Sequence, residues 1–193
     1  MTDKLIDEGD DRELIKAAQK GDKGSFGMIF NKYKTKSYQI AVGLMGNHDD
    51  AWDVTQEAFA RAWLHIDTFR LDEPFFPWLY QILRRLGLNK LRHNKNHSPA
   101  ETAQNENIYS DNSEFDPSVI AERNDRNDRI WKAVYSLGNL HREIIILRHF
   151  QELSYQELSE TLFISKGTVM SRLYNARKEL EKRLKRFMKQ ELL

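Results

Sequence analysis

The chain has 193 residues, an apolar fraction of 40% and a formal net charge of +1, which allows one or two domains with modest cores. It contains no cysteine, so disulfides and thiolate metal sites are excluded. The N-terminal segment is acidic where a signal peptide would be basic and then apolar, and no apolar run reaches the ~18 residues of a membrane span. We therefore expect a cytoplasmic protein without membrane insertion.

The first half of the chain has the apolar spacing of helices. The predicted helices cover about residues 11–20, 25–45 and 49–67. The segment from Thr68 to Pro77 contains two prolines and three phenylalanines, so it cannot continue as helix. A basic helix is expected to begin near Phe76 and to end near Asn94 or Asn96.

Charge is distributed unevenly along the chain. Residues 84–97 contain five cations and no acid, whereas residues 101–128 contain eight acids and two arginines. The segment from Ser98 to Asp116 is polar and aperiodic, which is typical of a linker. No alternating apolar and polar run with hairpin turns occurs, so we expect an all-α protein. The predicted organisation is two small helical domains, residues 1–97 and 119–193, joined by a flexible acidic linker over 98–118.

Residues 153–184 contain the same helix-start pattern twice, eleven residues apart. Ser154 and Glu157 have the spacing of a capping box, in which each side chain caps the backbone of the other residue. Ser165 and Thr168 repeat the spacing, and apolar residues stand in the flanking positions of both starts. Two short helices joined by a tight turn are therefore predicted, which is a helix-turn-helix.

The second of these helices has an apolar face and a basic face. Its apolar residues recur at helical spacing, at Val169, Leu173, Ala176, Leu180 and Leu184. Residues 166–189 contain nine Lys or Arg against two Glu. Hydroxyl, amide and cationic side chains of this kind contact base edges and phosphates in the major groove. A basic helix alone would fit a solvated surface, but the doubled helix start favours DNA binding.

Several segments resemble conserved regions of one family. DAWDVTQEAFAR at 50–61, Phe69-Arg70 and WLYQILRRLGLNKLR at 78–92 are similar to the second region of extracytoplasmic-function (ECF, group IV) RNA polymerase sigma factors. LSYQELSETLFISKGTVMSRLYNARKEL at 153–180 is similar to their fourth region. The resemblance covers about residues 10–95 and 120–187. It implies a non-enzymatic, dissociable subunit of bacterial RNA polymerase that recognises −35 and −10 promoter elements and aids promoter melting.

The resemblance also implies site residues, with no catalytic residue, metal or cofactor among them. The core polymerase, through the coiled coil of its largest subunit, would contact Asp53, Gln56 and Glu57. The −10 element would contact Phe69, Arg70, Phe75, Phe76, Arg84, Arg85 and Arg92. The −35 element would contact Lys166, Thr168, Ser171, Arg172, Tyr174, Asn175, Arg177 and Lys178. An anti-sigma factor is a further partner that the resemblance allows.

The −10 assignment has independent physical support. Melted DNA requires rings on which bases stack and cations that hold the single strand, and residues 69–92 provide both. Each stacked base is worth ~1–3 kcal/mol. The rings of Phe76 and Trp78 could equally belong to the core, and both interpretations stay open. The acidic linker is expected to occupy a nucleic-acid path of the polymerase.

Four positions depart from the family's usual pattern. Trp52 stands where a carboxylate is common, and Arg85 stands where asparagine is common. The first change is expected to alter the polymerase contact and the second the −10 contact. Phe163 occupies the position in the helix-turn-helix that is usually glycine, a residue that adopts a left-handed conformation at little cost. Ser159 replaces alanine and should fit. Phe163 is therefore expected either to be strained in the left-handed conformation or to change the geometry of the turn.

Two other functions fit parts of the sequence. Asp50, Asp53 and Glu57 lie on one helix face, as metal-binding carboxylates do in some hydrolases, but such bundles also require Glu-x-x-His motifs that this sequence lacks. A helix-turn-helix regulator that binds duplex DNA without an initiation role is the second alternative. A sigma factor would depend on core polymerase for tight, specific binding, whereas such a regulator would not.

Overall fold

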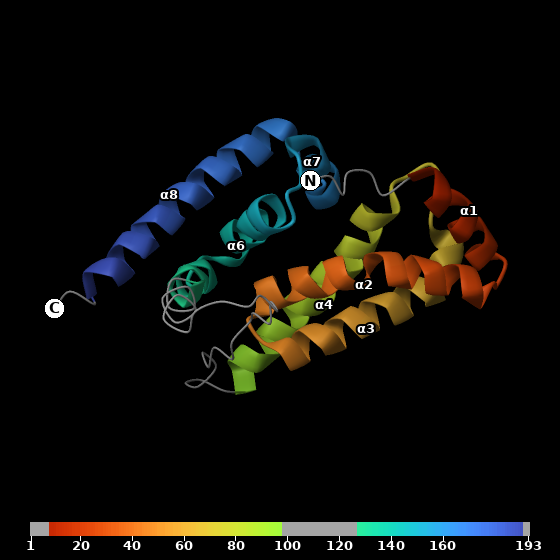
Figure 1. Ribbon diagram of the computed structural model, residues 1–193, viewed down its shortest axis with the longest axis horizontal. Helices are drawn as coiled ribbons and strands as arrows, with labels where there is room; N and C mark the ends of the chain where they lie inside the picture. The colour runs from red at the N-terminus through yellow and green to blue at the C-terminus, as the bar shows by residue number, and fades with distance from the viewer. Residues whose placement is uncertain (1–7, 98–126, 191–193) are drawn as a thin grey trace, which may run out of the picture. The chain divides into compact units, whose positions relative to one another are not determined.

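The computed structural model describes residues 8–97 and 127–190, and the regular secondary structure within these ranges is helical, without any strand. The chain forms two compact units, the first of which contains the residues up to His97 (Figure 1). The prediction of an all-α fold is confirmed. The proposed linker over residues 98–118 lies outside the described residues.

The first unit contains four longer helices and one short 3₁₀ turn. These elements are α1 (Glu8–Gln19), α2 (Lys23–Met45), α3 (His48–Leu64), η1 (Ile66–Thr68) and α4 (Phe75–His97). The prediction that the second helix begins near Ser25 was two residues late. Asp22 is the N-cap, and its carboxylate accepts hydrogen bonds from the Gly24 amide at 2.9 Å and from the Ser25 hydroxyl at 2.6 Å.

The third helix is shorter than predicted. It ends at Leu64 instead of Asp67, and η1 follows it. The side-chain amide of Gln19 donates to the carbonyls of Ile66 at 2.9 Å and Phe69 at 2.8 Å. In a continuing helix these carbonyls would accept backbone hydrogen bonds, but α3 has already ended. Because Gln19 belongs to α1, its two bonds stabilise the chain directly after the end of α3.

The fourth helix begins among the prolines of the aromatic segment. Pro74 directly precedes its first residue, Phe75, and Pro77 lies in its first turn. Amide groups of the first turn have no partner within a helix, so a proline there removes no hydrogen bond. The break between α3 and α4 was therefore predicted correctly.

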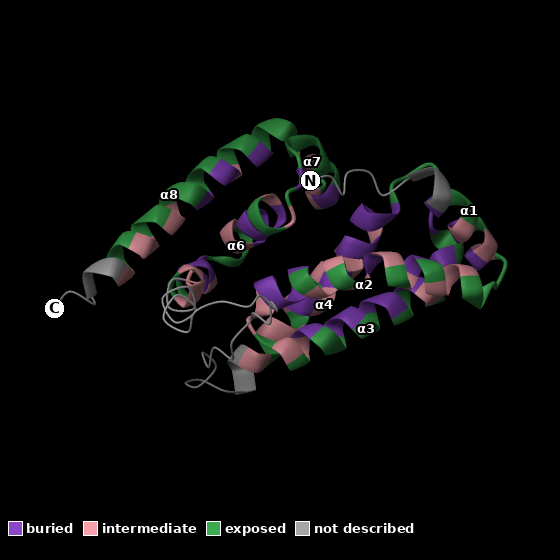
Figure 2. Cartoon of the chain, in the orientation of Figure 1, coloured by how far each residue is buried: buried purple, intermediate pink, exposed green. Residues whose placement is uncertain are grey.

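An aromatic cluster forms much of the core of the first unit. The ring centroids of Phe69 and Phe75 are 5.5 Å apart, and Trp78 lies 5.1 Å from Phe69. On the other side of the cluster, Tyr33 stacks on Phe76 at 5.9 Å. Figure 2 shows the buried positions of α2, α3 and α4 along their inner sides. This packing fixes the first turn of α4 against α2.

The second unit contains the predicted helix-turn-helix. Its helical segments are residues 127–135, α6 (Asn139–Ile145), the π-helical turn η2 (Ile146–Phe150), α7 (Tyr155–Leu162) and α8 (Lys166–Gln190). Both predicted capping patterns are present. Ser154 accepts from the Glu157 amide at 3.2 Å while Glu157 accepts from the Ser154 amide at 2.7 Å. Ser165 accepts from the Thr168 amide at 3.1 Å.

The turn between α7 and α8 contains a residue in the left-handed conformation. Phe163 has φ +53°, the region that the family's glycine would occupy, and its ring is 67% exposed. The hydroxyl of Ser159 donates to the carbonyl of Ile164 at 2.6 Å, and the Ile164 amide donates to the Ser159 carbonyl at 3.1 Å. These two bonds hold the turn closed despite the strain at Phe163.

Candidate functional site

The outer face of α3 presents the residues predicted to bind polymerase. Asp53, Gln56 and Glu57 are all exposed, because the buried residues of α3 lie on its opposite face against the core. Glu57 accepts a hydrogen bond from Arg61 at 2.7 Å, one turn further along the helix. The face is therefore polar and mainly acidic.

A cation on α4 neutralises part of this acidic region. Lys90 lies 3.0 Å from Asp50 and 3.7 Å from Asp53. Asn94 donates a second hydrogen bond to Asp50 at 2.8 Å. The pKa of Lys90 is raised, first by its hydrogen bond to Asp50 and then by the charge of that carboxylate. Asp50 therefore holds α4 against α3, while Asp53 stays mostly exposed.

This pairing bears on the metal-site alternative. One oxygen of Asp50 contacts Lys90 and the other accepts from Asn94, so the carboxylate is engaged on both sides. Across the described residues, no group of three or more His, Asp or Glu side chains is placed to hold a metal ion. The three carboxylates on α3 have the arrangement of a salt-bridged helix surface.

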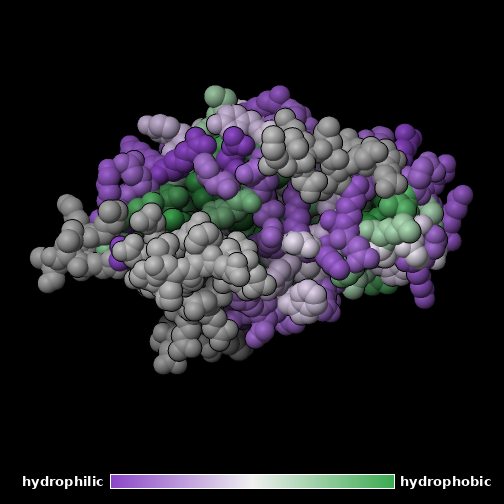
Figure 3. Space-filling model, in the orientation of Figure 1, coloured by the Kyte–Doolittle hydropathy of each residue, from purple (hydrophilic) through white to green (hydrophobic). Residues whose placement is uncertain are grey.

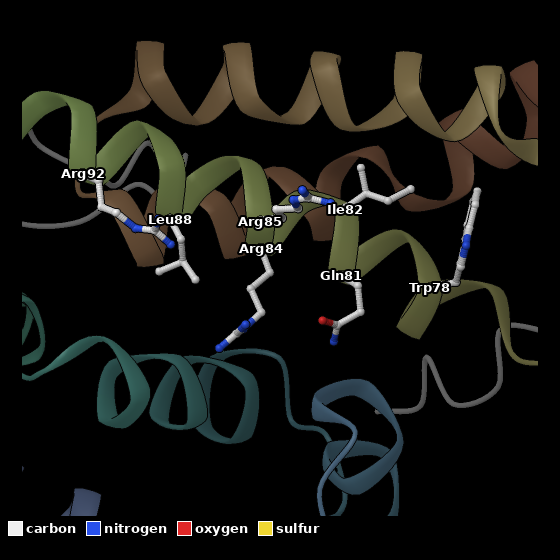
Figure 4. Close-up of a pocket in the computed structure, with 7 residues that line it drawn as sticks. All are labelled: Trp78, Gln81, Ile82, Arg84, Arg85, Leu88 and Arg92. Atoms are coloured by element: carbon white, nitrogen blue, oxygen red, sulfur yellow. The ribbon is translucent and has the colours of Figure 1, made fainter.

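A hollow runs along α4 and combines apolar and cationic side chains. It is lined by Trp78, Gln81, Ile82, Arg84, Arg85, Leu88 and Arg92 (Figure 4). Gln81 and Arg84 extend on the same side of the helix (Figure 4). Trp78 is half-buried, whereas Arg85 and Arg92 are exposed. An indole beside three guanidinium groups is the combination that single-stranded nucleic acid requires.

The structure corrects the expectation for the phenylalanines. Phe69, Phe75 and Phe76 are only 4%, 3% and 8% exposed, so none offers a free ring on which a base could stack. They are buried because they anchor the proline-broken segment to the core. Arg70 is exposed, but it forms ion pairs with Asp72 at 2.9 Å and Glu73 at 3.5 Å.

The residues predicted to contact the −35 element lie together on α8. Val169, Leu173 and Ala176 are fully buried, as the apolar stripe predicted, whereas Leu180 and Leu184 of the same predicted stripe are only half-buried. The predicted contact residues are exposed apart from the half-buried Arg172. Figure 2 shows exposed and buried positions on opposite sides of α8, and Figure 3 shows hydrophilic side chains gathered along its outer edge. The tertiary fold thus presents a largely polar helix face, on which Met170 is also exposed.

Some of these side chains are already engaged within the second unit. The Thr168 hydroxyl shares a hydrogen bond with that of Ser165 at 2.8 Å, and Ser171 donates to the Thr168 carbonyl at 3.1 Å. Arg177 donates to His149 of η2 at 3.3 Å. His149 was not predicted from the sequence, nor were Lys90 and Asn94 in the first unit. No sequence signal was available, because their partners lie 28 to 44 residues away along the chain.

Comparisons with known proteins decide between the functions that this geometry allows. The family model for Sigma-70 region 2 matches residues 29–97, and that for Sigma-70 region 4 matches residues 128–180. The ECF RNA polymerase sigma factor SigW of Bacillus subtilis is 33% identical, over 90% of this chain and 96% of its own. The chain belongs to the ECF RNA polymerase sigma factors. This sigma factor is therefore a promoter-recognising transcription initiation factor, and the alternative of a regulator without an initiation role is wrong.

Other relatives agree with this assignment. The RNA polymerase sigma-H factor of Pseudomonas aeruginosa is 28% identical to this sigma factor, over 96% of this chain and 100% of its own. The solved structure of CnrH in complex with the cytosolic domain of CnrY is 27% identical and covers 91% of this chain and 97% of that chain, with a TM-score of 0.65. No helix within residues 8–97 or 127–190 has the length and apolar character needed to cross a membrane.

Proposed function

We propose that this sigma factor binds core RNA polymerase through the outer face of α3 and contacts promoter DNA through α4 and α8. The observation that carries the proposal is the difference between the two faces of α8: Val169, Leu173 and Ala176 are buried, while the hydroxyl, amide and cationic side chains on the other face stay accessible. A helix of this kind can enter a major groove without unfolding any of its own packing.

Binding to polymerase is assigned to Asp53, Gln56 and Glu57. All three side chains are exposed, and the two carboxylates would attract a basic protein surface. The pairing of Asp50 with Lys90 supports the assignment indirectly, since it holds the helix that presents these side chains.

Binding to the −10 element is assigned to the cations of the α4 hollow, Arg84, Arg85 and Arg92, together with Arg70. The half-buried indole of Trp78 would supply the stacking surface in place of the three buried phenylalanines. Arg70 would have to exchange its ion pairs with Asp72 and Glu73 for phosphate contacts. Arg85, which stands where asparagine is common, adds a charge to this hollow.

Binding to the −35 element is assigned to the exposed face of α8. The first two turns supply Lys166, Thr168, Ser171 and Arg172, and the following turns supply Tyr174, Asn175, Arg177 and Lys178. Residues near the N-terminus of such a helix reach base edges, while later cations reach the phosphates. We therefore assign a base contact to Arg172, in the second turn, and phosphate contacts to the later cations Arg177 and Lys178.

The proposed organisation keeps residues 1–97 and 119–193 as the two binding domains, with 98–118 as the acidic connector. Two weak DNA-binding surfaces joined at a matched span bind more tightly than either alone. We further propose that the protein acts in the cytoplasm without catalytic residue, metal or cofactor. An anti-sigma factor is proposed as a second protein partner, which would cover the surfaces used by polymerase and DNA.

Run-off transcription tests this proposal. Core polymerase from the same bacterium, together with this chain, should produce promoter-specific transcripts from a genomic promoter library. Asp53→Ala should lower transcription by weakening polymerase binding, whereas Arg172→Ala should lower it with polymerase binding intact. The absence of promoter-specific transcripts with an active core would refute the proposed function. Tight, specific binding of this chain to promoter duplex without core would also contradict it.

A further inference from the structure

An exposed tryptophan stands on α3 among charged residues. Trp52 is 47% exposed, although indole is among the side chains that gain most from burial. It lies next to Asp53 and one turn before Gln56, both of which are also exposed. The sequence predicts for Trp52, as a departure from the family's carboxylate, only a change in the polymerase contact.

The indole is held in place by neighbouring residues of the first unit. The ring of Tyr38 on α2 packs edge-on against Trp52, with centroids 5.8 Å apart and an interplanar angle of 82°. The hydroxyl of Tyr38 is in turn hydrogen-bonded to Nδ1 of His48 at 2.6 Å. The indole is therefore supported by the Tyr38 ring, while about half of the residue stays exposed. An aromatic side chain held in this way loses little conformational entropy on binding.

The charges around Trp52 indicate what kind of partner it fits. Asp49 lies about one turn before Trp52 and Asp53 directly follows it, and both carboxylates are exposed. Carboxylates repel the phosphate backbone, so this surface does not suit nucleic acid. A large aromatic anchor with a polar rim is instead the composition of a protein interface, and the acidic rim selects a basic partner surface.

We propose that Trp52 is the principal apolar anchor of the interface with core RNA polymerase. The inference rests on the proposed function, because it places Trp52 beside the exposed polar residues assigned to polymerase binding. The partner surface would contain an apolar recess flanked by Lys or Arg. Tyr38 acts as a positioning residue, since it supports the indole without belonging to the exposed face itself.

Titration of labelled full-length chain with core polymerase tests the inference. Trp52→Ala is expected to raise the dissociation constant at least tenfold, and Trp52→Phe is expected to restore part of the loss because a ring is kept. Tyr38→Phe keeps the ring edge but removes the bond to His48, so a smaller weakening is expected. Met28→Ala, which truncates a 62% exposed apolar side chain on α2, is the matched control and should bind as the unaltered chain does. Thermal melts of each variant exclude unfolding as the cause.

The outcomes separate this inference from the proposed function. If Asp53→Ala weakens polymerase binding while Trp52→Ala leaves it unchanged, Trp52 is not an anchor of the interface and the inference is refuted. The proposed function then still stands. If the unaltered chain does not bind core at all, the proposed function itself fails. If Trp52→Ala abolishes self-association of the chain without affecting core binding, the indole belongs to an interface between two copies, and the inference is overturned.

Discussion

The Nε–H of Arg177 on α8 donates a hydrogen bond to Nε2 of His149 on η2, with the two atoms 3.3 Å apart. Nε2 can accept this bond only while the imidazole is neutral, with its proton on Nδ1. The pKa of His149 is lowered, first because the ring is partly desolvated and then because Arg177 and Arg148 are close by. The π-helical turn thus places a neutral histidine behind a cation of the proposed DNA-binding face.

Acidification should destabilise the second unit through His149. A lowered pKa in the folded state means that the unfolded chain takes up the proton more readily, so stability is lost as the pH falls below the ordinary value of 6.5. We expect His149→Gln, which keeps an acceptor but does not titrate, to lose less free energy of unfolding between pH 7.5 and 5 than the unaltered chain. Urea unfolding at both pH values measures this. The same substitution at exposed His65 in the first unit is the control, and an equal pH effect in both variants would contradict the prediction.

Relieving the strained turn should stabilise the second unit. Phe163 has φ +53°, and its exposed ring gains little from burial. Phe163→Gly removes a left-handed strain of about 1–2 kcal/mol, partly offset by the greater freedom of glycine in the unfolded chain. We expect a net gain of about 0.5–1 kcal/mol in urea unfolding. A loss of stability would show that the ring makes a contact worth more than the strain.

The hydroxyl of Ser159 should matter for the same turn. Ser159→Ala removes the 2.6 Å hydrogen bond to the Ile164 carbonyl and is expected to cost about 1 kcal/mol of unfolding free energy. Because the bond holds the turn closed around Phe163, the cost should be smaller when the strain is already relieved. A double-mutant cycle with Phe163→Gly measures this coupling. Strict additivity would mean that the bond and the strain are independent.

Arg172 and Arg177 should affect promoter binding differently. Arg172→Ala is expected to weaken binding to the −35 element by about 1–3 kcal/mol and to relax selectivity at one base position. Arg177→Ala is expected to weaken binding to all promoters equally. It should also reduce the slope of log binding constant against log salt concentration by about one. Holoenzyme binding to a set of −35 variants at several salt concentrations distinguishes the two. Arg186→Ala, a basic residue far from the start of α8, serves as the matched control. Equal selectivity in all three variants would exclude Arg172 as a base-reading residue.

Removing Lys90, the cation that pairs with Asp50 between α3 and α4, should lower the stability of the first unit. The loss should be the same with and without divalent metal ions. Lys90→Met breaks the contact with Asp50 at 3.0 Å and is expected to cost at most about 1 kcal/mol, since Lys90 is partly exposed. The raised pKa of Lys90 means that the pair contributes at neutral pH and is lost only as the pH rises above about 10.5. Thermal melts with and without Mg²⁺ or Mn²⁺ should coincide for the unaltered chain and for Lys90→Met. A metal-dependent rise in melting temperature would revive the hydrolase alternative.

Local features of the fold were predictable from the chain itself. Both capping patterns join residues three positions apart, and the apolar stripe of α8 and the break before α4 follow from residue type and spacing within one segment. Such interactions depend on side-chain type and spacing, which the sequence states directly. The polar face of α8 was predictable for the same reason, because burying one side of a helix exposes the other.

The sequence by itself thus determined the all-α class, the helix-turn-helix and the family. Only the tertiary structure decided which rings are buried and which charges are paired. Phe69, Phe75 and Phe76 have the composition of a stacking surface, yet they fill the core. Trp52 was predicted only to change the polymerase contact, and the structure shows it exposed and packed against Tyr38. Burial and ion pairing depend on contacts between segments far apart in the chain. A local pattern of residue types does not specify which distant segments come into contact.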